Sequence, residues 1–472
     1  MKTITMKFGG TSVGSVEAIR NVIYITQREL EQGNRVILTV SAMSGVTDTL
    51  LSSIQLAREG DRWGYLSVAE KLRDKHQEAI NQLVSAGPNR DKISRNIGKL
   101  IDEYIELCQA INVLGEATPR IRDAVTAFGE KMSARLVAMA LQDQGVDARP
   151  IDASEVVVTD DNHQNAAPIW ELTEPNIRST IFPLIEGGIV PVVTGFIGST
   201  KAGVLTTLGR GGGDFSGAIF AAYSDSDELI IWTDVDGVMT TDPRVDKRAR
   251  VLPYVSYQEV GELAYYGAKV LHPKTVQPLM NRGIPLYVRN TFNPDHPGTL
   301  IGPTPQPSLS VIKAVTSVKN VSMVTISGRG MIGVPGIAGR AFLSAAQAGA
   351  NILMISQSSS EQSMCFVVTD EKALDARDMI TQEFSTEIAN QNIENIEVSD
   401  EVVIVTVVGS GMRGTPGVAG RVFTALGREE VNVLAIAQGS SECSISFVID
   451  QAELQRAVVL LHDLALEAVP EV

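Results

Sequence analysis

Cysteine, histidine and long apolar runs are scarce in this sequence of 472 residues. The three cysteines, Cys108, Cys365 and Cys443, lie far apart and match neither a disulfide framework nor a metal-ligand spacing, and the five histidines form no zinc motif. No apolar run approaches the roughly 20 residues that cross a bilayer, and the N-terminal MKTITMKFGG lacks the apolar stretch of a signal peptide. We therefore expect a cytoplasmic protein without a metal site built from cysteine or histidine.

Positive charge is also in deficit. The chain has 40 Lys and Arg against 55 Asp and Glu, a formal net charge of −15, which predicts no general affinity for nucleic acid or for an anionic membrane. The phosphate-binding motif G-x-x-x-x-G-K-[ST] is absent from the sequence as well. Any phosphate group must therefore be held by a local site of another design.

The N-terminal part of the chain alternates between strand-like and helix-like segments. ITMKF (4–8) is followed by a helical segment at 15–30 and by RVILTVSA (35–42), an order typical of parallel α/β proteins. Residues 65–125 are charged and predict a peripheral helical excursion. Further strands are predicted at 189–198, 228–235 and 284–290.

The C-terminal part contains an internal repeat. Residues 293–308, before it, hold five prolines and two glycines, more than a helix interior or a central strand tolerates, and they predict a domain boundary. Beyond them, TISGRGMIGVPGIAGRAF (325–342) aligns with TVVGSGMRGTPGVAGRVF (406–423), and NILMISQSSSEQS (351–363) aligns with NVLAIAQGSSECS (432–444). The repeat predicts two copies of one small domain.

GRGMIG (328–333) and GSGMRG (409–414) match the G-x-G-x-x-G spacing of dinucleotide-binding loops. Each repeat, however, reads strand, glycine loop, helix, strand, strand, helix, and lacks the second crossover helix and the acidic residue that a dinucleotide site needs. Helix starts at Gly336 and Gly417 instead offer backbone N–H groups to a small anion such as an amino-acid carboxylate. Paired units with this glycine pattern resemble ACT domains.

MKFGGTSVGS (6–15) joins a strand to a helix through two glycines. Lys7 ends the strand, and Thr11, Ser12 or Ser15 can cap the helix. A glycine turn, a helix N-terminus and a lysine together favour an anion site, although an ordinary turn with an incidental lysine has the same pattern.

Two further motifs follow predicted strands. TTLGRGGGDFSGA (206–218) has three consecutive glycines between Arg210, which suits a carboxylate or phosphate, and Asp214, which can hold magnesium; a flexible loop is the alternative. IIWTDVDGVMTTDPR (230–244) ends a strand in a polar turn, where ligands of doubly wound sheets bind, although solvated turns use the same residues. Three weaker motifs are VSAMSGVTD (40–48), AFGEKMSARL (127–136) and YYGAKVLHP (265–273).

These motifs, in this order ahead of the tandem ACT-like pair, resemble the aspartokinases of the amino acid kinase family over almost the whole chain. The resemblance implies an α/β fold: a three-layer αβα sandwich with a mostly parallel sheet, followed by two ferredoxin-like (βαββαβ) ACT domains. By this resemblance we expect a catalytic domain at 1–292, a proline-rich linker at 293–310, a first ACT domain at 321–395, and a second formed by 311–320 together with 396–472.

Aspartokinases transfer the γ-phosphate of MgATP to the side-chain carboxylate of L-aspartate, giving 4-phospho-L-aspartate, the first step of lysine, threonine and methionine synthesis. Because a carboxylate with a pKa of ~4 is ionised at neutral pH, this nucleophile needs no general base. The enzyme must instead align two anions and neutralise charge on the phosphoryl group. The resemblance therefore implies ATP and Mg²⁺ as cofactors.

The resemblance assigns roles to the matching positions. Lys7 would contact the transferring phosphate, and Asp214 would organise the catalytic cations. Glu130 would bind the amino group of aspartate, and Arg210 its α-carboxylate. The implied aspartate-binding residues are Thr47, Glu130, Arg210, Gly211, Gly212 and Gly213. The implied ATP-binding residues are Lys7, Phe8, Gly9, Gly10, Ser41, Thr233, Asp234, Met239, Arg244, Lys269 and Val270.

The ACT resemblance implies feedback inhibition by an amino acid, lysine or threonine, and assembly into a homodimer or larger homo-oligomer through the ACT domains. The implied effector contacts are Met331, Ile332, Gly333, Val334, Asn351, Ile352 and Gln357 in the first repeat and Met412, Asn432 and Gln438 in the second. The chain ends at Val472, which leaves no room for the homoserine dehydrogenase fused to some aspartokinases, so we expect a monofunctional kinase.

Three positions depart from the family pattern. Gly213 stands where the family usually has serine, Met239 where many members have an aromatic residue, and Ser444 where many relatives have asparagine. The first two predict an altered affinity for ATP, and the third leaves the identity of the effector open.

Two other functions fit parts of the sequence. A kinase for another small acid, such as glutamate, is the closest alternative, because Glu130 and Arg210 do not set the length of the substrate. A regulatory amino-acid sensor with an inactive kinase domain is the other, and the intact Lys7 and Asp214 argue against it.

Overall fold

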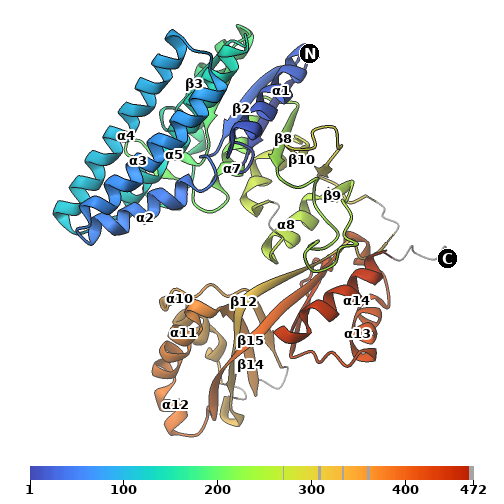
Figure 1. The fold of residues 1–472 in the computed structure, drawn as a ribbon. Coiled ribbons are helices and arrows are strands. Elements are labelled where there is room, and N and C mark those ends of the chain that lie inside the picture. The colour runs from blue at the N-terminus through green and yellow to red at the C-terminus, as the bar shows by residue number, and fades with distance from the viewer. Residues whose placement is uncertain (269–270, 307–309, 332–333, 359–361, 467–472) are drawn as a thin grey trace. The chain divides into compact units, whose positions relative to one another are not determined.

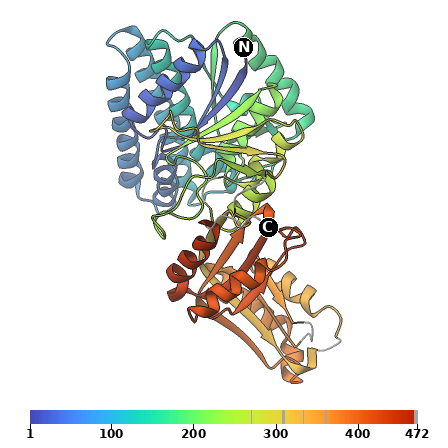
Figure 2. The same ribbon diagram turned by 90° about the vertical axis from the view of Figure 1, so that its right-hand side faces the viewer.

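The computed structural model describes residues 1–268, 271–306, 310–331, 334–358 and 362–466. It divides into two compact units, each with its own hydrophobic core (Figures 1 and 2). The first unit comprises Met1–Val238, Pro253–Tyr257 and Val270–Thr304. The second comprises Met239–Leu252, Gln258–Lys269 and Pro305–Val472.

The first unit is built on an eight-stranded sheet with the order β3-β5-β2-β1-β8-β10-β11-β9. All neighbouring strands are parallel except β10 and β11, which are antiparallel. A smaller sheet has the order β4-β6-β7. The strands are β1 (Thr3–Phe8), β2 (Arg35–Val40), β3 (Ala148–Ile151), β4 (Val158–Thr159), β5 (Val190–Thr194), β6 (Ile197–Thr200), β7 (Leu205–Thr207), β8 (Glu228–Thr233), β9 (Tyr254–Ser256), β10 (Leu286–Asn290) and β11 (Thr299–Gly302).

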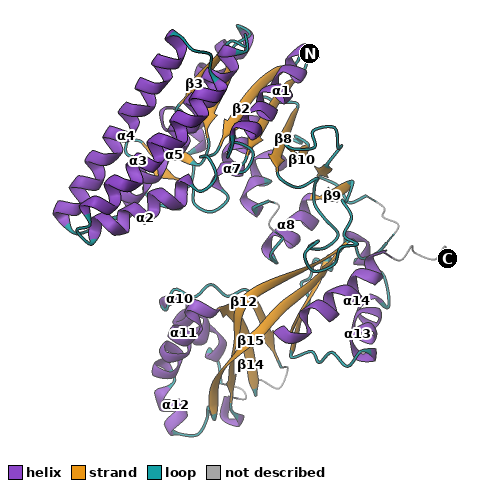
Figure 3. Ribbon diagram, viewed as in Figure 1, coloured by secondary structure: helices purple, strands orange, loops and turns teal. Residues whose placement is uncertain are grey.

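Helices cover both faces of this sheet (Figure 3). Leu38 of β2 packs in one core with Ile19 of α1, whereas Ile37 packs in another core with Ile181 of α6 and Phe220 of α7. Because successive strand residues point to opposite faces, this is the predicted three-layer αβα sandwich. The helices are α1 (Val16–Glu31), α2 (Val46–Arg58), α3 (Arg62–Leu83), α4 (Pro88–Leu114), α5 (Pro119–Asp143), α6 (Trp170–Glu186), α7 (Gly212–Tyr223) and α9 (Gln277–Met280), with 3₁₀ turns η1 (Ala153–Glu155) and η2 (Pro273–Thr275).

The central strands are almost fully buried. In β1 and β2, TITMKF and RVILTV, every residue after the first is buried, as expected for parallel strands covered on both faces. The helices α3 and α4 form the helical excursion predicted at 65–125, and they pack against α2 and α5 (Figure 1). At the start of α1, Ser15 is the cap, since its Oγ accepts a hydrogen bond from the Ala18 N–H at 3.1 Å.

The segment predicted as a proline-rich linker begins inside the first unit. Residues Thr299–Gly302 form β11, which lies between β10 and β9 in the sheet, and the first unit ends only at Thr304. The expectation that this segment holds no central strand was therefore wrong. Pro297 and Pro303 flank β11 without lying in it, so they remove no donor from its ladder.

The second unit is a six-stranded antiparallel sheet with the order β13-β14-β12-β15-β17-β16. The helices α10 and α11 share a core with one half of the sheet, and α13 and α14 share a core with the other. Both repeats follow the predicted order of strand, helix, strand, strand, helix. The elements are β12 (Ala314–Ser327), α10 (Ile337–Gln347), β13 (Met354–Gln357), β14 (Ser363–Thr369), α11 (Asp370–Glu383), α12 (Ser385–Ala389), β15 (Asn395–Val408), α13 (Val418–Arg428), β16 (Ala435–Ala437), β17 (Ser444–Asp450) and α14 (Leu454–Leu466), with 3₁₀ turns η3 (Arg329–Met331), η4 (Ser410–Met412) and η5 (Gln451–Glu453).

Strand β12 runs through both repeats. Residues 314–318 pair with 404–408 of β15, whereas residues 321–327 pair with β14 and with the first half of β15. The first half of β12 thus extends the sheet of the second repeat. This pairing supports the proposed division in which 311–320 and 396–472 form one ACT domain.

Two segments from within the proposed catalytic domain, 1–292, pack in the second unit. Helix α8 (Tyr257–Tyr265) brings the buried Glu259 to Lys313, with a 3.0 Å ion pair. The segment Met239–Leu252 brings the buried Asp246 to the ring of His462 on α14, at 2.8 Å. These buried polar contacts explain why the packing division differs from a boundary at residue 292.

Candidate active site

Lys7 lies at the end of β1 between two glycine-rich segments. Its Nζ forms a 2.5 Å ion pair with Oδ1 of Asp214 in the first turn of α7, and its side chain is only 9% exposed. A Cβ atom on Gly213 would lie 3.4 Å from the Lys7 side chain, and one on Gly217 would lie 2.9 Å from it. The glycines of α7 therefore let that helix pack directly against the lysine.

Glu130 is a buried carboxylate on α5. Its Oε1 accepts a hydrogen bond from the Ala42 N–H at 3.2 Å, whereas Oε2 is buried and has no hydrogen-bond partner among the residues that the structure describes. Burial raises the pKa of Glu130 to about 7, although the Ala42 N–H and the charge of Lys7 oppose the shift. A ligand that donates hydrogen bonds, such as an ammonium group, would satisfy the second oxygen.

The N-terminus of α7 forms a third part of the site. Gly211 is its N-cap with a φ of 74°, a left-handed conformation that glycine adopts without strain. The exposed Arg210 precedes it, and the backbone N–H groups of the first turn suit an anion. A Cβ on Gly211 would lie 2.3 Å from the Cβ of His272, so this loop also requires glycine for packing.

Glu130 and the N-terminus of α7 line one pocket of about 710 Å³ in the first unit. Gly9 and Gly213, which lie beside the Lys7 side chain, line it as well, whereas Lys7 and Asp214 themselves are not among its lining residues. Ser41, which follows β2, also lines the pocket, as does Thr47 in the first turn of α2. The predicted site residues that line the pocket are Gly9, Gly10, Ser41, Thr47, Glu130, Arg210, Gly211, Gly212, Gly213 and Thr233. The structure therefore brings together residues from five motifs that are far apart in the sequence.

Some predicted ATP-binding residues do not line this pocket. Phe8 is buried and stacks on Trp232, and the Asp234 carboxylate accepts a 3.2 Å hydrogen bond from Thr233. Met239 and the exposed Arg244, which pairs with Asp242, belong to the second unit. Lys269 and Val270 lie outside the described residues.

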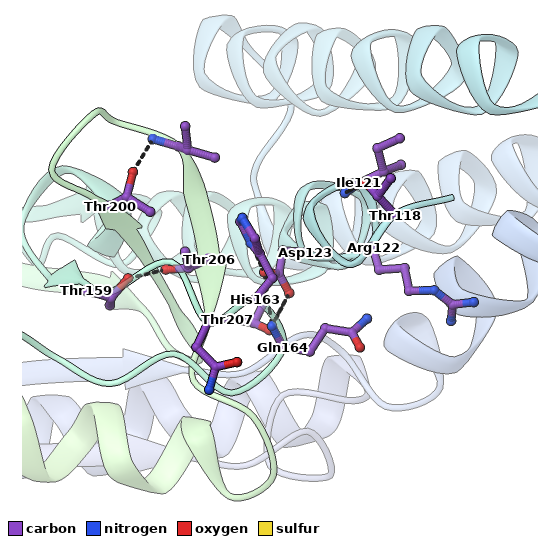
Figure 4. A network of polar contacts seen from close by, with 12 residues as sticks. Thr118, Ile121, Arg122, Asp123, Thr159, His163, Gln164, Thr200, Thr206 and Thr207 are labelled. Atoms are coloured by element: carbon purple, nitrogen blue, oxygen red, sulfur yellow. Dashed lines mark hydrogen bonds and ion pairs between the residues drawn. The ribbon is translucent and has the colours of Figure 1, made fainter. Parts of the chain in front are cut away.

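The sequence prediction missed a polar network in the pocket wall (Figure 4). The buried Asp123 on α5 accepts hydrogen bonds from Thr207 Oγ1 at 2.6 Å, from the Gln164 N–H at 3.2 Å and from the His163 ring at 2.6 Å. Asp123, Gln164 and Thr207 line the pocket, and so does Arg122. The available signal was the spacing of Asp123, Thr126 and Glu130, which places the three on one face of a helix.

The predicted effector residues differ in exposure. Met331 and Met412 are buried in the cores of their repeats, so only their backbone could contact a ligand. Asn351, Gln357, Asn432 and Gln438 are exposed, as is Val334, and Ile352 is half-buried. Ile332 and Gly333 lie outside the described residues.

The two parts of the chain match two known protein families. Residues 2–290 match the amino acid kinase family, and residues 324–384 and 405–464 match the ACT domain. Aspartokinase 1, chloroplastic, of Arabidopsis thaliana is 32% identical over 471 residues, which cover 98% of this chain and 79% of that protein. Bifunctional aspartokinase/homoserine dehydrogenase 1, chloroplastic, of the same plant is 36% identical over 464 residues, covering 97% of this chain but 50% of that protein.

Among solved structures, E. coli aspartokinase III in complex with aspartate and ADP is similar to this chain, with a TM-score of 0.82 and 26% identity over 99% of this chain and 100% of that one. The mostly parallel αβα unit with its glycine-lined pocket coincides with the match to the amino acid kinase family. The chain belongs to the amino acid kinase family and, within it, to the aspartokinases with C-terminal ACT domains. It spans about half the length of the bifunctional relatives. No described helix is both long and apolar enough to cross a bilayer.

Proposed function

We infer that this chain is an aspartate kinase that transfers the γ-phosphate of MgATP to the β-carboxylate of L-aspartate. The observation that carries the proposal is Glu130, a buried carboxylate in the same pocket as Arg210, with one oxygen that no described residue pairs with. A carboxylate and a guanidinium in one pocket are complementary to the ammonium and α-carboxylate groups of an amino acid. The structure of E. coli aspartokinase III with aspartate and ADP supports the choice of substrate and nucleotide.

The residues around Lys7 suit phosphate transfer. Lys7 supplies a buried positive charge beside the glycines of both loops, and the N-terminus of α7 supplies backbone donors. Asp214, which pairs with Lys7, would hold the Mg²⁺ that accompanies ATP, because this ion is commonly bound by one or two carboxylates together with phosphate oxygens. Bound Mg²⁺ neutralises charge on the phosphoryl oxygens. Lys7, whose Nζ lies beside Gly9 and Gly213, would contact the transferring phosphate.

The ACT pair supports regulation by an amino acid and self-association. We propose that lysine or threonine binds near the glycine loops of the repeats and that copies of the chain associate through their ACT domains. The structure of E. coli aspartokinase III in complex with lysine and aspartate, named as a T-state, supports this proposal. Lysine is thus the first effector to test.

One assay tests the activity. The chain is incubated with MgATP and either aspartate or glutamate, and the acyl phosphate is trapped with hydroxylamine, with and without lysine and threonine. We expect product from aspartate, and Lys7→Ala should lower turnover by at least about a hundredfold because it removes the charge beside the phosphate. Absence of product from aspartate would overturn the proposal. Product from glutamate alone would indicate a glutamate kinase instead.

A further inference from the structure

Asp123 is a buried carboxylate in the wall of the pocket, and the family resemblance gave it no role. It lies on α5 seven residues before Glu130, with Thr126 between them, and all three line the pocket. Residues with this spacing share one face of a helix. Asp123 is 1% exposed, so its charge is held inside the protein and needs partners.

Those partners use both oxygens of the carboxylate. Oδ1 accepts from Thr207 Oγ1 at 2.6 Å and Oδ2 from His163 Nδ1 at 2.6 Å, while the Gln164 N–H is 3.2 Å from each oxygen. A carboxylate has room for about four hydrogen bonds. The hydrogen-bonding capacity of Asp123 is therefore used by the protein itself, which suits this residue to hold others in place. Glu130, in contrast, has one oxygen without a partner among the described residues.

The segment that Asp123 holds is the loop between β4 and α6. At its base, the Asp160 N–H donates to Ala167 O at 3.0 Å, and at its tip Gln164 has a φ of 69°. A left-handed conformation is unfavourable for a residue other than glycine and persists only where the surroundings impose it. The hydrogen bond from the Gln164 N–H to Asp123 is such a constraint.

The same loop also contacts residues 207–209, which directly precede Arg210. The Ala166 N–H donates to Thr207 O at 2.9 Å. Gly209, with a φ of 74°, lies so close to the loop that a Cβ there would be 2.8 Å from Gln164 O. Asp123 thus joins α5, the loop and the residues before Arg210 into one wall, and in Figure 4 the Gln164 amide extends from this wall away from Asp123, toward the side of Arg122.

We propose that Asp123 is a positioning residue that fixes Gln164 in the pocket, and that the Gln164 side-chain amide contacts the acidic substrate. The inference rests on the proposed function and adds to it a group for aspartate besides Glu130 and Arg210. An amide can donate to a carboxylate of the substrate without adding charge to a pocket that must also accept a second anion.

Three variants test the proposal in steady-state assays with aspartate and MgATP varied in turn. Asp123→Asn keeps the shape of the side chain but loses one charged acceptor, and it should raise KM for aspartate by about tenfold or more. Gln164→Gly removes only the side chain, because glycine tolerates a φ of 69°, and it should raise the same KM by about tenfold. The double variant should have a KM for aspartate less than about twofold above that of Gln164→Gly alone, since both substitutions act through the Gln164 amide.

A matched control lies on the same helix. Asp143, at the end of α5, also accepts hydrogen bonds from a backbone N–H and a hydroxyl, both of Ser85, and it does not line the pocket. Asp143→Asn should leave KM for aspartate within about twofold of the wild-type value. KM for MgATP should stay within about twofold in all variants, because the wall faces aspartate.

The outcomes separate this inference from the proposed function. If the wild-type chain makes no acyl phosphate from aspartate, the proposed function fails, and the inference fails with it. If the wild type is active but Gln164→Gly leaves KM for aspartate unchanged, only the inference is overturned. Equal increases in KM for aspartate and for MgATP in Asp123→Asn would also overturn it, since they would indicate general loosening of the domain.

Discussion

The charge of Glu130 depends on its burial in the pocket wall. Burial raises the pKa of its carboxyl to about 7, so at neutral pH it is near the midpoint of its titration. A ligand with an ammonium group needs the ionised form, and its binding should therefore draw a proton off the residue.

We expect the affinity for aspartate to fall as the pH drops below about 7. Because only ionised Glu130 pairs with the amino group, the dissociation constant should rise by about tenfold per pH unit below the pKa. Titration calorimetry with aspartate alone, between pH 5.5 and 8, measures this without interference from the titration of ATP. The variant Glu130→Gln should bind weakly and without pH dependence; a wild-type dissociation constant that is constant over this range would contradict the assignment.

The same shift predicts the pH dependence of stability. The pKa of Glu130 is higher in the folded chain, about 7, than the 4.5 of an exposed glutamate. Its stabilising contribution is therefore complete below about 4.5 and is lost as the pH rises through about 7. Glu130→Gln removes the buried charge, and its stability relative to wild type should increase by up to about 3 kcal/mol between pH 5 and pH 8. Urea unfolding at both pH values checks this, and an equal difference at both would contradict it.

At the scale of residues, the sequence indicated which single residues belong to the site better than it indicated which residues contact one another. Lys7, Glu130 and Arg210 were found because they lie in motifs with glycines or strand ends. Asp123 was missed because its partners, at 163, 164 and 207, are distant in sequence, and only the fold brings them together. The side chains of Met331 and Met412 lie in cores, which the glycine pattern around them does not reveal.

At the scale of elements, the site depends on how closely α7 packs on β1. Gly217 lies in the middle of α7, and a Cβ there would be 2.9 Å from the Cβ of Lys7. That atom is at the base of the lysine side chain and cannot move without displacing β1 or α7. A helix with a larger residue at this position would therefore push Lys7 away from Asp214.

We expect Gly217→Ala to destabilise the first unit by about 1–3 kcal/mol through overpacking and to lower kcat, because it displaces the lysine. Gly98, in the middle of α4, is the matched control, since its nearest neighbour would be 3.5 Å away. Gly98→Ala should instead stabilise the same unit by about 0.5–1 kcal/mol without changing kcat. Thermal unfolding and the hydroxylamine assay measure both effects, and similar results for the two variants would refute this explanation.

Strands and helices were predictable where the pattern was strong. The apolar runs of β1, β2 and β8 and the repeat of the C-terminal elements were all visible in the sequence. The short β11 was not, because four residues between prolines give no periodic signal, and its place in the sheet is set by pairing with β10 and β9.

At the scale of the molecule, the two repeats of the second unit are not equivalent. The loop of the second repeat is bound by α8, since Glu259 Oε1 accepts from the Ser410 N–H at 2.7 Å and Glu262 accepts from Ser444 Oγ at 2.8 Å. A segment that precedes the repeats in sequence thus supplies a carboxylate that accepts the hydrogen bond which this loop would otherwise donate to the carboxylate of an amino acid. The Ser410 N–H of the second loop is already bonded to Glu259, so the first repeat is the better candidate for an effector.

This asymmetry predicts which substitutions change feedback. Asn351 and Asn432 are exposed and occupy matching positions in the two repeats. Asn351→Ala should raise the lysine or threonine concentration for half inhibition by about fivefold or more, a coupling loss of the usual size, and should leave kcat and KM without effector unchanged. Asn432→Ala, the same substitution in the repeat whose loop α8 already binds, should shift that concentration by less than about twofold. Inhibition curves for the two variants decide the matter, and a larger shift for Asn432→Ala would show that the effector uses the second repeat despite Glu259.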